Sequence, residues 1–392
     1  MGKILRGCKT HKRLTVKQIA QCFGVKKGVY TEGVLLDIHT MKTKSKAHHS
    51  LPKPTTSVSN MILVIVERAQ FPVSLQRYKS ISFMKKIITL TFSPSIDKST
   101  SVQALMPEKK LTCAPPKMEA GGGGINVARA IKKLGGHALA VFPSGGYTGV
   151  FFNHLLEKEN IPCIIIETTH ETRENLVVLD ESTHNQYRFG MPSTALLENE
   201  WQECLKAVEG IKSGGFIVAS GSLPPGVPLN IYAQLAKIAK KSNAKFIVDT
   251  SGEALIQAAD EGVYLLKPNL GELALLAGLE KIDIADVENV AKKIIHKNQC
   301  AIIVVSLGKD GAILVTKNET HKVIPPKVDT KSTVGAGDSM VAGLVYSLSR
   351  GRSLKQTLQY GVACGTAATM NLGTELCRKE DVEKLFKLLT VE

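Results

Sequence analysis

The sequence predicts an α/β fold with a mainly parallel sheet. From Met84 onward, short apolar runs alternate with stretches of helical periodicity, and this alternation is typical of parallel strands joined by crossover helices. Hydrophobic residues make up 43% of the 392 residues, which is enough to bury a core. Glycine-rich segments follow several of the apolar runs, where ligands bind in open α/β sheets. We therefore expect a ligand-binding domain over residues 84–392.

The apolar runs are short and bounded by turn-forming residues, as buried strands are. The expected strands are Ile87–Phe92, Ala138–Phe142, Ile161–Ile166, Phe216–Ser220, Lys245–Asp249, Val263–Leu266 and Ile302–Ser306. The expected helices are Asn126–Leu134, Gly149–Glu159, Glu200–Ile211, Asn230–Lys240, Glu253–Asp260, Ile284–Lys297 and Met340–Ser349. This order predicts right-handed crossovers between parallel strands.

One pair of expected strands has no helix between its members. Glu174–Leu179 and Asn185–Phe189 are joined by the turn-rich residues Asp180–His184. A direct turn joins antiparallel strands, so the pair predicts a hairpin outside the main sheet. We expect it to form part of a small β lid over the strand ends, made by residues of about 95–120 and 172–192.

Residues 1–83 differ from the rest of the chain in charge and pattern. They contain 15 of the 50 lysines and arginines but only 3 of the 35 aspartates and glutamates. Lysine, histidine and proline dominate Lys42–Pro54, a composition that cannot supply a core. We expect a basic, disordered or partly ordered N-terminal extension. Two alternatives stay open: a targeting segment, and an upstream extension that is not translated, because Met84 opens directly into a strand pattern.

The composition also excludes several classes of protein. No apolar run approaches the ~18 residues that a membrane-spanning helix needs. The net charge of +15 belongs mostly to residues 1–83, so the expected domain lacks the basic surface of a nucleic-acid-binding protein. The eight cysteines form no CxxC motif, which favours reduced, buried thiols in a cytoplasmic protein. Nucleic-acid binding by residues 1–83 alone stays open.

Two loops are expected to form walls of a ligand site. Gly121–Gly124 lead into a helix, so the backbone can approach a ligand closely, and Asn126 can bond a polyol. Asp97, after the first strand, can accept hydrogen bonds from sugar hydroxyls. Gly221–Gly226 follow the strand that ends at Ser220 and contain two prolines, which makes the loop rigid. Taken singly, these features can also be explained as a tight turn, a cap and a connector.

A third segment, Lys267–Glu272, follows the strand Val263–Leu266. Asn269 and Glu272 are three residues apart at the start of a helix, so both side chains can face the same side. Oxygen ligands at this spacing suit a hydrated Mg²⁺ held mostly through substrate phosphates. The same pair fits a capping box, in which each side chain bonds the backbone of the other residue. Both interpretations can hold together.

The most specific segment is Ser332–Ser339, which opens a helix. Its small residues leave the first-turn amides open to a phosphate, and the helix dipole favours the negative charge that builds up in phosphoryl transfer. Asp338 is placed to take a proton from an attacking hydroxyl. Taken alone, Asp338 could equally be an ordinary helix cap. The pattern GxxxxGK[ST] is absent, so this is not a P-loop enzyme.

Together these segments resemble the ribokinase-like (PfkB) family of carbohydrate kinases. Its two signatures match Gly121–Gly136 and Asp329–Asp338, and the likeness runs in order from about Met84 to Leu389. Within the family the chain looks like the bacterial phosphofructokinase branch. The supporting stretches are Leu90–Asp97, Thr172–Leu176, Gln186–Phe189, Ser220–Gly226, Ser251–Leu255 and Ser306–Gly308.

The resemblance implies a three-layer α/β/α domain with a β lid that mediates homodimerisation. It implies transfer of a phosphoryl group from ATP-Mg²⁺ to fructose 6-phosphate, as in glycolysis. The catalytic groups would be Gly335, Ala336, Gly337 and Asp338, with Asp338 as base beside an anion hole of backbone amides. The sugar phosphate would be bound by Asp97, Lys110, Gly122, Gly123, Asn126, Arg173, Arg188 and Ser222. The nucleotide would contact Lys267, Asn269, Ser306, Gly308, Thr333 and Asn371, with Mg²⁺ near Asn269 and Glu272.

The resemblance also allows a monovalent cation such as K⁺ near Ser332, Val334, Ala368, Asn371 and Gly373. Two positions depart from the branch: Thr112 and Glu375 stand where it can carry arginine. The first departure weakens one arm of the phosphate clamp, and the second changes the loop beside the cation. Two other acceptors, fructose 1-phosphate and tagatose 6-phosphate, stay open. A non-catalytic sugar-phosphate-binding regulator would be expected to lose Asp338 or the glycines, and both are intact.

Overall fold

The structure, a computed structural model, describes residues 14–15, 35–36, 86–210, 214–297 and 300–391. The chain divides into two units, Met1–Gln70 and Phe71–Glu392. In the first unit the described residues form one antiparallel pair, β1 (Leu14–Thr15) with β2 (Leu35–Leu36). Apart from these residues, the expected disordered extension over residues 1–83 lies outside the described part of the chain.

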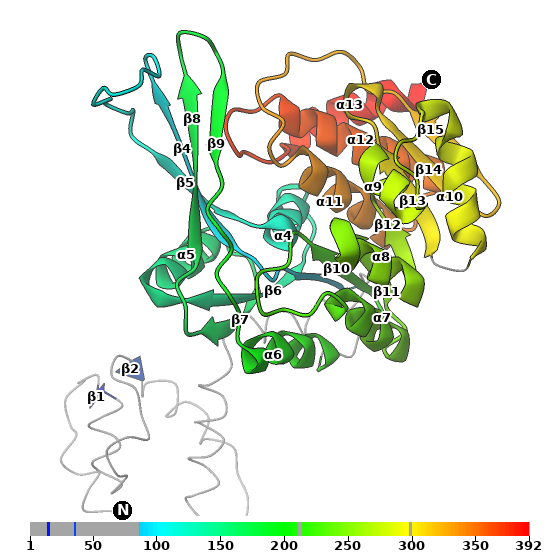
Figure 1. The fold of residues 1–392 in the computed structure, drawn as a ribbon, viewed down its shortest axis with the longest axis horizontal. Helices are drawn as coiled ribbons and strands as arrows, with labels where there is room; N and C mark the ends of the chain where they lie inside the picture. The colour runs from blue at the N-terminus through cyan, green and yellow to red at the C-terminus, as the bar shows by residue number, and fades with distance from the viewer. Residues whose placement is uncertain (1–13, 16–34, 37–85, 211–213, 298–299, 392) are drawn as a thin grey trace, which may run out of the picture. The chain divides into compact units, whose positions relative to one another are not determined.

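A nine-stranded sheet forms the centre of the second unit (Figure 1). Its order is β15-β14-β13-β12-β11-β10-β3-β6-β7, and the strands from β13 to β7 run parallel. The parallel strands are β3 (Ile87–Leu90), β6 (Leu139–Gly145), β7 (Cys163–Thr168), β10 (Phe216–Ser220), β11 (Lys245–Asp249), β12 (Val263–Leu266) and β13 (Cys300–Ser306). Each matches an expected strand, with small shifts at the ends. The antiparallel edge strands β14 (Ala312–Thr316) and β15 (Thr320–Val323) complete the sheet.

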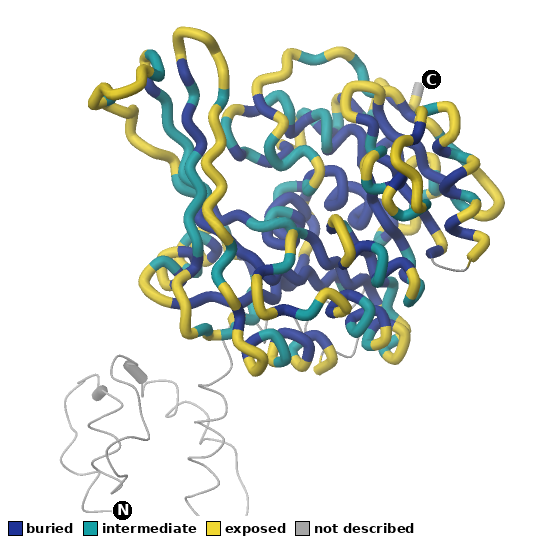
Figure 2. Tube along the Cα trace, in the orientation of Figure 1, coloured by how far each residue is buried: buried dark blue, intermediate teal, exposed yellow. Residues whose placement is uncertain are grey.

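Helices cover both faces of this sheet, because neighbouring strand residues point to opposite sides. Ile87 packs into one buried cluster and Ile88 into the other. The first cluster lies under α4 (Gly123–Lys133), α5 (Gly146–Lys158), α11 (Ala336–Ser349), α12 (Leu354–Thr369) and α13 (Lys379–Val391). The second lies under α6 (Glu198–Glu209), α7 (Ile231–Lys241), α8 (Gly252–Glu261), α9 (Leu270–Leu276) and α10 (Val287–His296). The expected α/β/α layers are confirmed, and Figure 2 shows the buried residues between them.

A second sheet forms the expected lid. Its four strands are β4 (Ser95–Val102), β5 (Lys117–Gly121), β8 (Arg173–Asp180) and β9 (Gln186–Phe189), in the order β5-β4-β8-β9. The β8–β9 pair is the hairpin predicted between residues 174 and 189. The lid stands beside the helices of the main domain at the upper left of Figure 1.

The described cysteines are free, as expected, but they are not all buried. Cys204, Cys300, Cys364 and Cys377 are buried, whereas Cys163 is half-buried and Cys113 is exposed. Cys113 is exposed because the residues between β4 and β5 form an open loop rather than part of the core. Among the described residues, no helix has the length and apolar character needed to cross a membrane.

Replacement of Phe142 tests the packing of the first cluster. Phe142 is fully buried on β6 and meets Phe152 of α5 edge to face, with ring centroids 5.3 Å apart. We expect Phe142→Ala to lower the free energy of unfolding by about 3–5 kcal/mol, because it removes a large buried ring and leaves a cavity. Tyr147→Ala is the control, since Tyr147 on α5 is 91% exposed. Urea unfolding should separate the two variants, and similar small losses in both would contradict the assignment.

Candidate active site

The N-terminus of α11 is open on the side that faces Lys267. Gly335 precedes the helix with φ 74°, a left-handed conformation that glycine adopts without strain. The first-turn amides of a helix have no acceptor inside it. In this turn the Ala336 amide has only a 3.5 Å contact with the Thr333 carbonyl. A Cβ atom placed on Gly337 would meet only the Lys267 Nζ within 4 Å, at 4.0 Å. The space between the helix and the ammonium group therefore suits an anion.

Three neighbouring parallel strands end beneath this helix and deliver polar side chains. Lys267 follows β12 and is buried, and its Nζ lies 3.1 Å from Asp249 Oδ1 at the end of β11. Ser220, at the end of β10, bonds Asp249 Oδ2 and Asp338 Oδ1, each at 3.4 Å. Asn126 of α4 donates from Nδ2 to Asp338 Oδ2 at 2.9 Å. A lysine, two carboxylates and two hydrogen-bonding side chains thus meet at one point.

This environment raises the pKa of Asp338 to about 7. Asp338 keeps part of its surface open, but the protein packed around its carboxylate disfavours the charged form, and the nearby charge of Asp249 adds to this. Asn126, Lys267 and Ser220 act in the opposite direction. A carboxylate with a pKa near 7 is well matched to take up a proton at neutral pH.

Asp249 is a site residue that sequence reasoning missed. It is the last residue of β11 and pairs with Ser220 in the parallel register. Burial lowers the pKa of Lys267. The charge and the hydrogen bond of Asp249, with smaller contributions from Glu272 and Asp338, together outweigh burial, so the pKa is raised and the group stays cationic. An acidic residue at the carboxyl end of an expected strand was the available signal. Its partner Lys267 lies eighteen residues further on, so no local pattern joined the two.

Glycine is required where the lid strand enters the site. A Cβ on Gly121 would lie 2.1 Å from Asp97 Oδ2, and one on Gly123 would lie 2.4 Å from Ser220 Oγ. Gly122 has φ 105°, which only glycine adopts readily. These glycines bring β4, α4 and β10 close together. Close approach of this backbone to a ligand stays a prediction.

Asp97 lies on the inner part of the lid, beside the glycines. Its Oδ1 accepts hydrogen bonds from Ser95 Oγ and Asn175 Nδ2, both at 2.9 Å. Burial raises its pKa, although these hydrogen bonds and Arg173 oppose the shift. Arg173 begins β8 opposite Ser95 and donates to the Met191 carbonyl at 3.0 Å. Asp97 and Arg173 are therefore brought together, as expected.

Of the other residues expected to bind the sugar phosphate, some lie near the site and one does not. Arg188 of β9 donates to Thr333 Oγ1 at 3.1 Å, so the lid reaches the loop before α11. Ser222 is exposed in the loop after β10. Lys110 is exposed in the loop between β4 and β5, and among the described residues no hydrogen bond or ion pair joins it to the site. Within this chain, Lys110 is not brought to the other residues, because that loop lies beyond the outer ends of the lid strands.

The expected nucleotide residues follow β12 and β13. Asn269 and Glu272 form the predicted capping box at the start of α9: Asn269 Oδ1 accepts from the Glu272 amide and Glu272 Oε2 from the Asn269 amide, each at 2.9 Å. Asn269 also forms a parallel bridge with Ser306. Gly308, with φ 60°, starts the short 3-10 helix η4 (Gly308–Asp310). Within the described chain no group of three His, Cys, Asp or Glu residues could hold a metal by itself.

Two loops that were expected to hold a monovalent cation lie together. Ser332 Oγ donates to the Gly373 carbonyl at 2.7 Å and accepts from the Val334 amide at 3.2 Å. The backbone N–H of Asn371 donates to the Ala368 carbonyl at 3.2 Å. The Asn371 side chain holds the loop, since Nδ2 donates to the Leu376 carbonyl at 3.0 Å. Hydroxyl and carbonyl oxygens are the ligands that K⁺ prefers, so this set fits the ion.

Comparisons with known proteins define the class. Residues 92–381 match the pfkB family of carbohydrate kinases, and the chain belongs to this family. It is 46% identical over 308 residues to the ATP-dependent 6-phosphofructokinase isozyme 2 of Escherichia coli strain K12, covering 78% of this chain and 100% of that protein. It is 30% identical over 307 residues to the 1-phosphofructokinase of Borreliella burgdorferi, covering 78% and 98%.

Solved structures of the phosphofructokinase-2 from Escherichia coli are similar to this one. The structure in complex with potassium gives a TM-score of 0.76 at 45% identity, and the structure in complex with fructose-6-phosphate gives 0.75 at 44%. In both cases the match covers 78% of this chain and 100% of the other chain. The similarity therefore extends over the whole length of that enzyme.

Burial is the main cause of the raised pKa of Asp338, and the charge of Asp249 should contribute to the pH dependence of the site. Catalytic efficiency, kcat/KM, should fall as the pH drops through about 7, because protonated Asp338 cannot accept a proton. Asp249→Asn removes a negative charge that raises the pKa of Asp338, while the hydrogen bonds from Asn126 and Ser220, which lower it, remain. We expect the acidic limb of the pH profile to move to lower pH. Asp286→Asn, on an exposed segment, is the control. An acidic limb that stays in place or moves upward would contradict the role of Asp249.

Proposed function

We propose that this protein is an ATP-dependent 6-phosphofructokinase. It would transfer the γ-phosphate of ATP to O1 of fructose 6-phosphate, giving fructose 1,6-bisphosphate and ADP. The observation that carries this proposal is Asp338, with a pKa near 7, beside the open N-terminus of α11 that faces Lys267. The choice of acceptor follows the relatives, since identity to a 6-phosphofructokinase is 46% and to a 1-phosphofructokinase 30%.

The arrangement supplies what phosphoryl transfer requires, which is positioning and charge stabilisation. Asp338 would accept the proton of the O1 hydroxyl as that oxygen attacks the γ-phosphorus, and the bond from the γ-phosphorus to the bridging oxygen of ADP breaks. The amides of Ala336, Gly337 and Asp338 would stabilise the charge on the transferred group, and Lys267 would add its positive charge. The contact of Arg188 with Thr333 supports a lid that covers the reacting groups.

The sugar phosphate would lie between the lid and α4. Asp97 and Asn126 are oriented by hydrogen bonds and would hold sugar hydroxyls. Arg173 would grip the phosphate, because a guanidinium group can bond two phosphate oxygens at once. Lys110 could reach a sugar phosphate only if its loop moved or belonged to a second copy. We therefore propose a homodimer through the lid, whose strand β9 leaves Tyr187 and Phe189 exposed.

Metal ions would assist from the nucleotide side. Asp249 contacts Lys267, and the charge of Glu272 acts on the same lysine. With Asn269, which shares the capping box of Glu272, these oxygens would fit a Mg²⁺ held mainly through ATP phosphates and water. Such an ion would neutralise charge on the β- and γ-phosphates. K⁺ would fit the oxygens of the Ser332 and Gly373 loops. Free thiols throughout the described chain agree with the cytoplasmic location that we propose.

Replacement of the proposed base tests the mechanism. Asp338→Asn keeps the size of the side chain but cannot accept the proton, so kcat should fall by about 10²–10⁴-fold. ATP binding, followed by calorimetry, and the unfolding midpoint should stay close to the wild-type values. A kcat within a few-fold of wild type would remove Asp338 from this role.

A coupled assay of ADP release tests the acceptor. We expect the highest kcat/KM on fructose 6-phosphate, with lower values on fructose 1-phosphate and tagatose 6-phosphate. A preference for either of the other two sugars would replace the proposed activity by that alternative. Absence of turnover with all three would instead favour a sugar-phosphate-binding regulator.

A further inference from the structure

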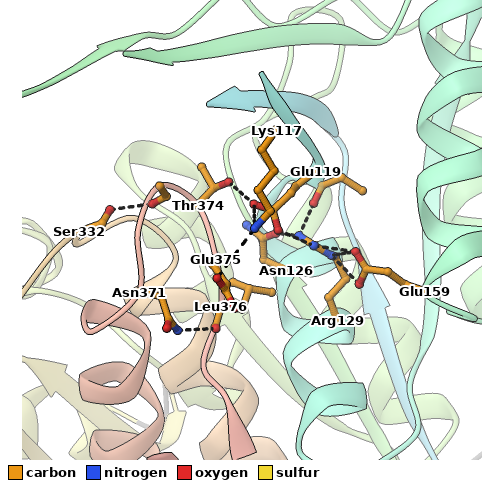
Figure 3. Close-up of polar contacts among 12 residues, drawn as sticks. Lys117, Glu119, Asn126, Arg129, Glu159, Ser332, Asn371, Thr374, Glu375 and Leu376 are labelled. Atoms are coloured by element: carbon orange, nitrogen blue, oxygen red, sulfur yellow. Dashed lines mark hydrogen bonds and ion pairs between the residues drawn. The ribbon is translucent and has the colours of Figure 1, made fainter. Parts of the chain in front are cut away.

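Arg129 is a buried cation to which the proposed mechanism assigns no role. It lies on α4, one turn after Asn126, and is only 3% exposed. Its Nε and Nη2 bond Glu159, with a shortest distance of 2.7 Å, and Nη2 also lies 3.1 Å from Glu119 Oε1. Its Nη1 donates to the Ala120 carbonyl at 2.6 Å and approaches Asn126 Oδ1 at 3.5 Å. Figure 3 shows this guanidinium group between β5, α4 and the end of α5.

Glu119 connects Arg129 to a distant loop. It is buried on β5, and its Oε2 accepts from Thr374 Oγ1 at 2.9 Å, a contact between residues 255 positions apart. Burial alone would raise the pKa of Glu119, but Arg129, Lys117 and the hydrogen bond from Thr374 together outweigh it, and the pKa is lowered. Glu119 therefore stays ionised. It lies directly opposite Asp97 in the β4–β5 register.

The loop that Thr374 belongs to leads back to the catalytic helix. Its neighbour Gly373 accepts from Ser332 Oγ, in the loop before α11. Glu375, which stands where the related branch can carry arginine, lies 3.9 Å from Lys117 of β5. A series of contacts thus runs from Asn126 and β5, on the sugar side of the site, through the Thr374 loop to Ser332 in the loop before α11. Figure 3 shows the side chains at Glu119, Thr374 and Ser332.

We infer that the buried pair Arg129–Glu119, together with Thr374, is a positioning device that holds the sugar-binding strand and helix in register with the loop supporting α11. This inference rests on the proposed function. The hydrogen bonds of Arg129 go to Asn126, to β5 and to Glu159, and none goes to Asp338. We therefore place its action through Asn126 and β5. The planar guanidinium group of Arg129 donates hydrogen bonds in several fixed directions at once. The single ammonium group of a lysine cannot reproduce them.

The main test is Arg129→Lys, which keeps the charge but loses the simultaneous bonds to Glu119, Glu159 and Ala120. A misplacement near 1 Å lowers efficiency by about 10²-fold, and we expect a loss of this order in kcat/KM for fructose 6-phosphate, with a raised KM. The KM for ATP should stay close to wild type. A merely structural role would lower the active fraction and leave both KM values unchanged, and that result would overturn the inference.

Arg352→Lys is a matched control. Arg352 is a half-buried arginine packed on the Tyr360 ring at 4.4 Å, just beyond the opposite end of α11. Its replacement should affect stability without changing the KM for fructose 6-phosphate. A rise in that KM equal to the rise in Arg129→Lys would show a general effect of arginine loss and would refute the specific role of Arg129.

Thr374→Val supplies a second test if Arg129→Lys does not fold. This change removes the hydroxyl that joins the loop to Glu119 and nearly preserves the volume of the side chain. Hydrogen exchange should then become faster both in Asn371–Leu376 and in β5, because the two segments share Glu119. Faster exchange in the loop alone would contradict the coupling.

The two proposals fail in different ways. If wild-type protein shows no turnover of fructose 6-phosphate, the proposed function fails, while hydrogen exchange in Thr374→Val still tests the coupling without any substrate. If wild-type protein is active and neither KM nor exchange changes in the variants, the coupling fails and the proposed function stands.

Discussion

The pairing of Lys267 with Asp249 is the interaction on which the rest of the site depends. A buried ammonium group without a partner would cost several kcal/mol, so the carboxylate at the end of β11 makes the lysine possible. The lysine in turn gives positive charge to the space below the N-terminus of α11. Burial raises the pKa of Asp338, and the same carboxylate raises it further and so adjusts the neighbouring base. One ion pair therefore links the stability of the site to its electrostatics.

The sheet decides where these groups meet. Ser220, Asp249 and Lys267 come from consecutive strands, and the parallel order of β10, β11 and β12 places their carboxyl ends side by side. Asn126 arrives from α4 and Asp338 from α11, two helices on the same face of the sheet. The glycines of Gly121–Gly124 are needed because any side chain at Gly121 or Gly123 would collide with the site itself.

The lid is anchored from two directions. Its outer strand β9 contacts the loop before α11 through Arg188, and its other edge strand β5 contacts the loop after α12 through Glu119. Both loops flank the catalytic helix. A shift of the lid would therefore displace both loops that flank α11. This gives a physical basis for linking sugar binding to the geometry of phosphoryl transfer.

The sequence by itself determined the buried parallel strands, the α/β/α class, the capping box of Asn269 with Glu272 and the helix that begins at the Gly335–Asp338 segment. These features rest on local spacing, which a chain carries in its residue order. The sequence did not reveal β4 as a strand, because Ser95–Val102 is mostly polar and gains its regular structure from pairing with β5 and β8.

Only the tertiary structure decided which charged and polar side chains face one another. Asp249 with Lys267, Arg129 with Glu119 and Glu119 with Thr374 are joined by folding, and no local pattern marks such pairs. It likewise decided that Lys110 lies apart from Asp97 and that Cys113 is exposed. Electrostatic contacts and pKa values depend on distances and burial, and both exist only once remote segments have packed together.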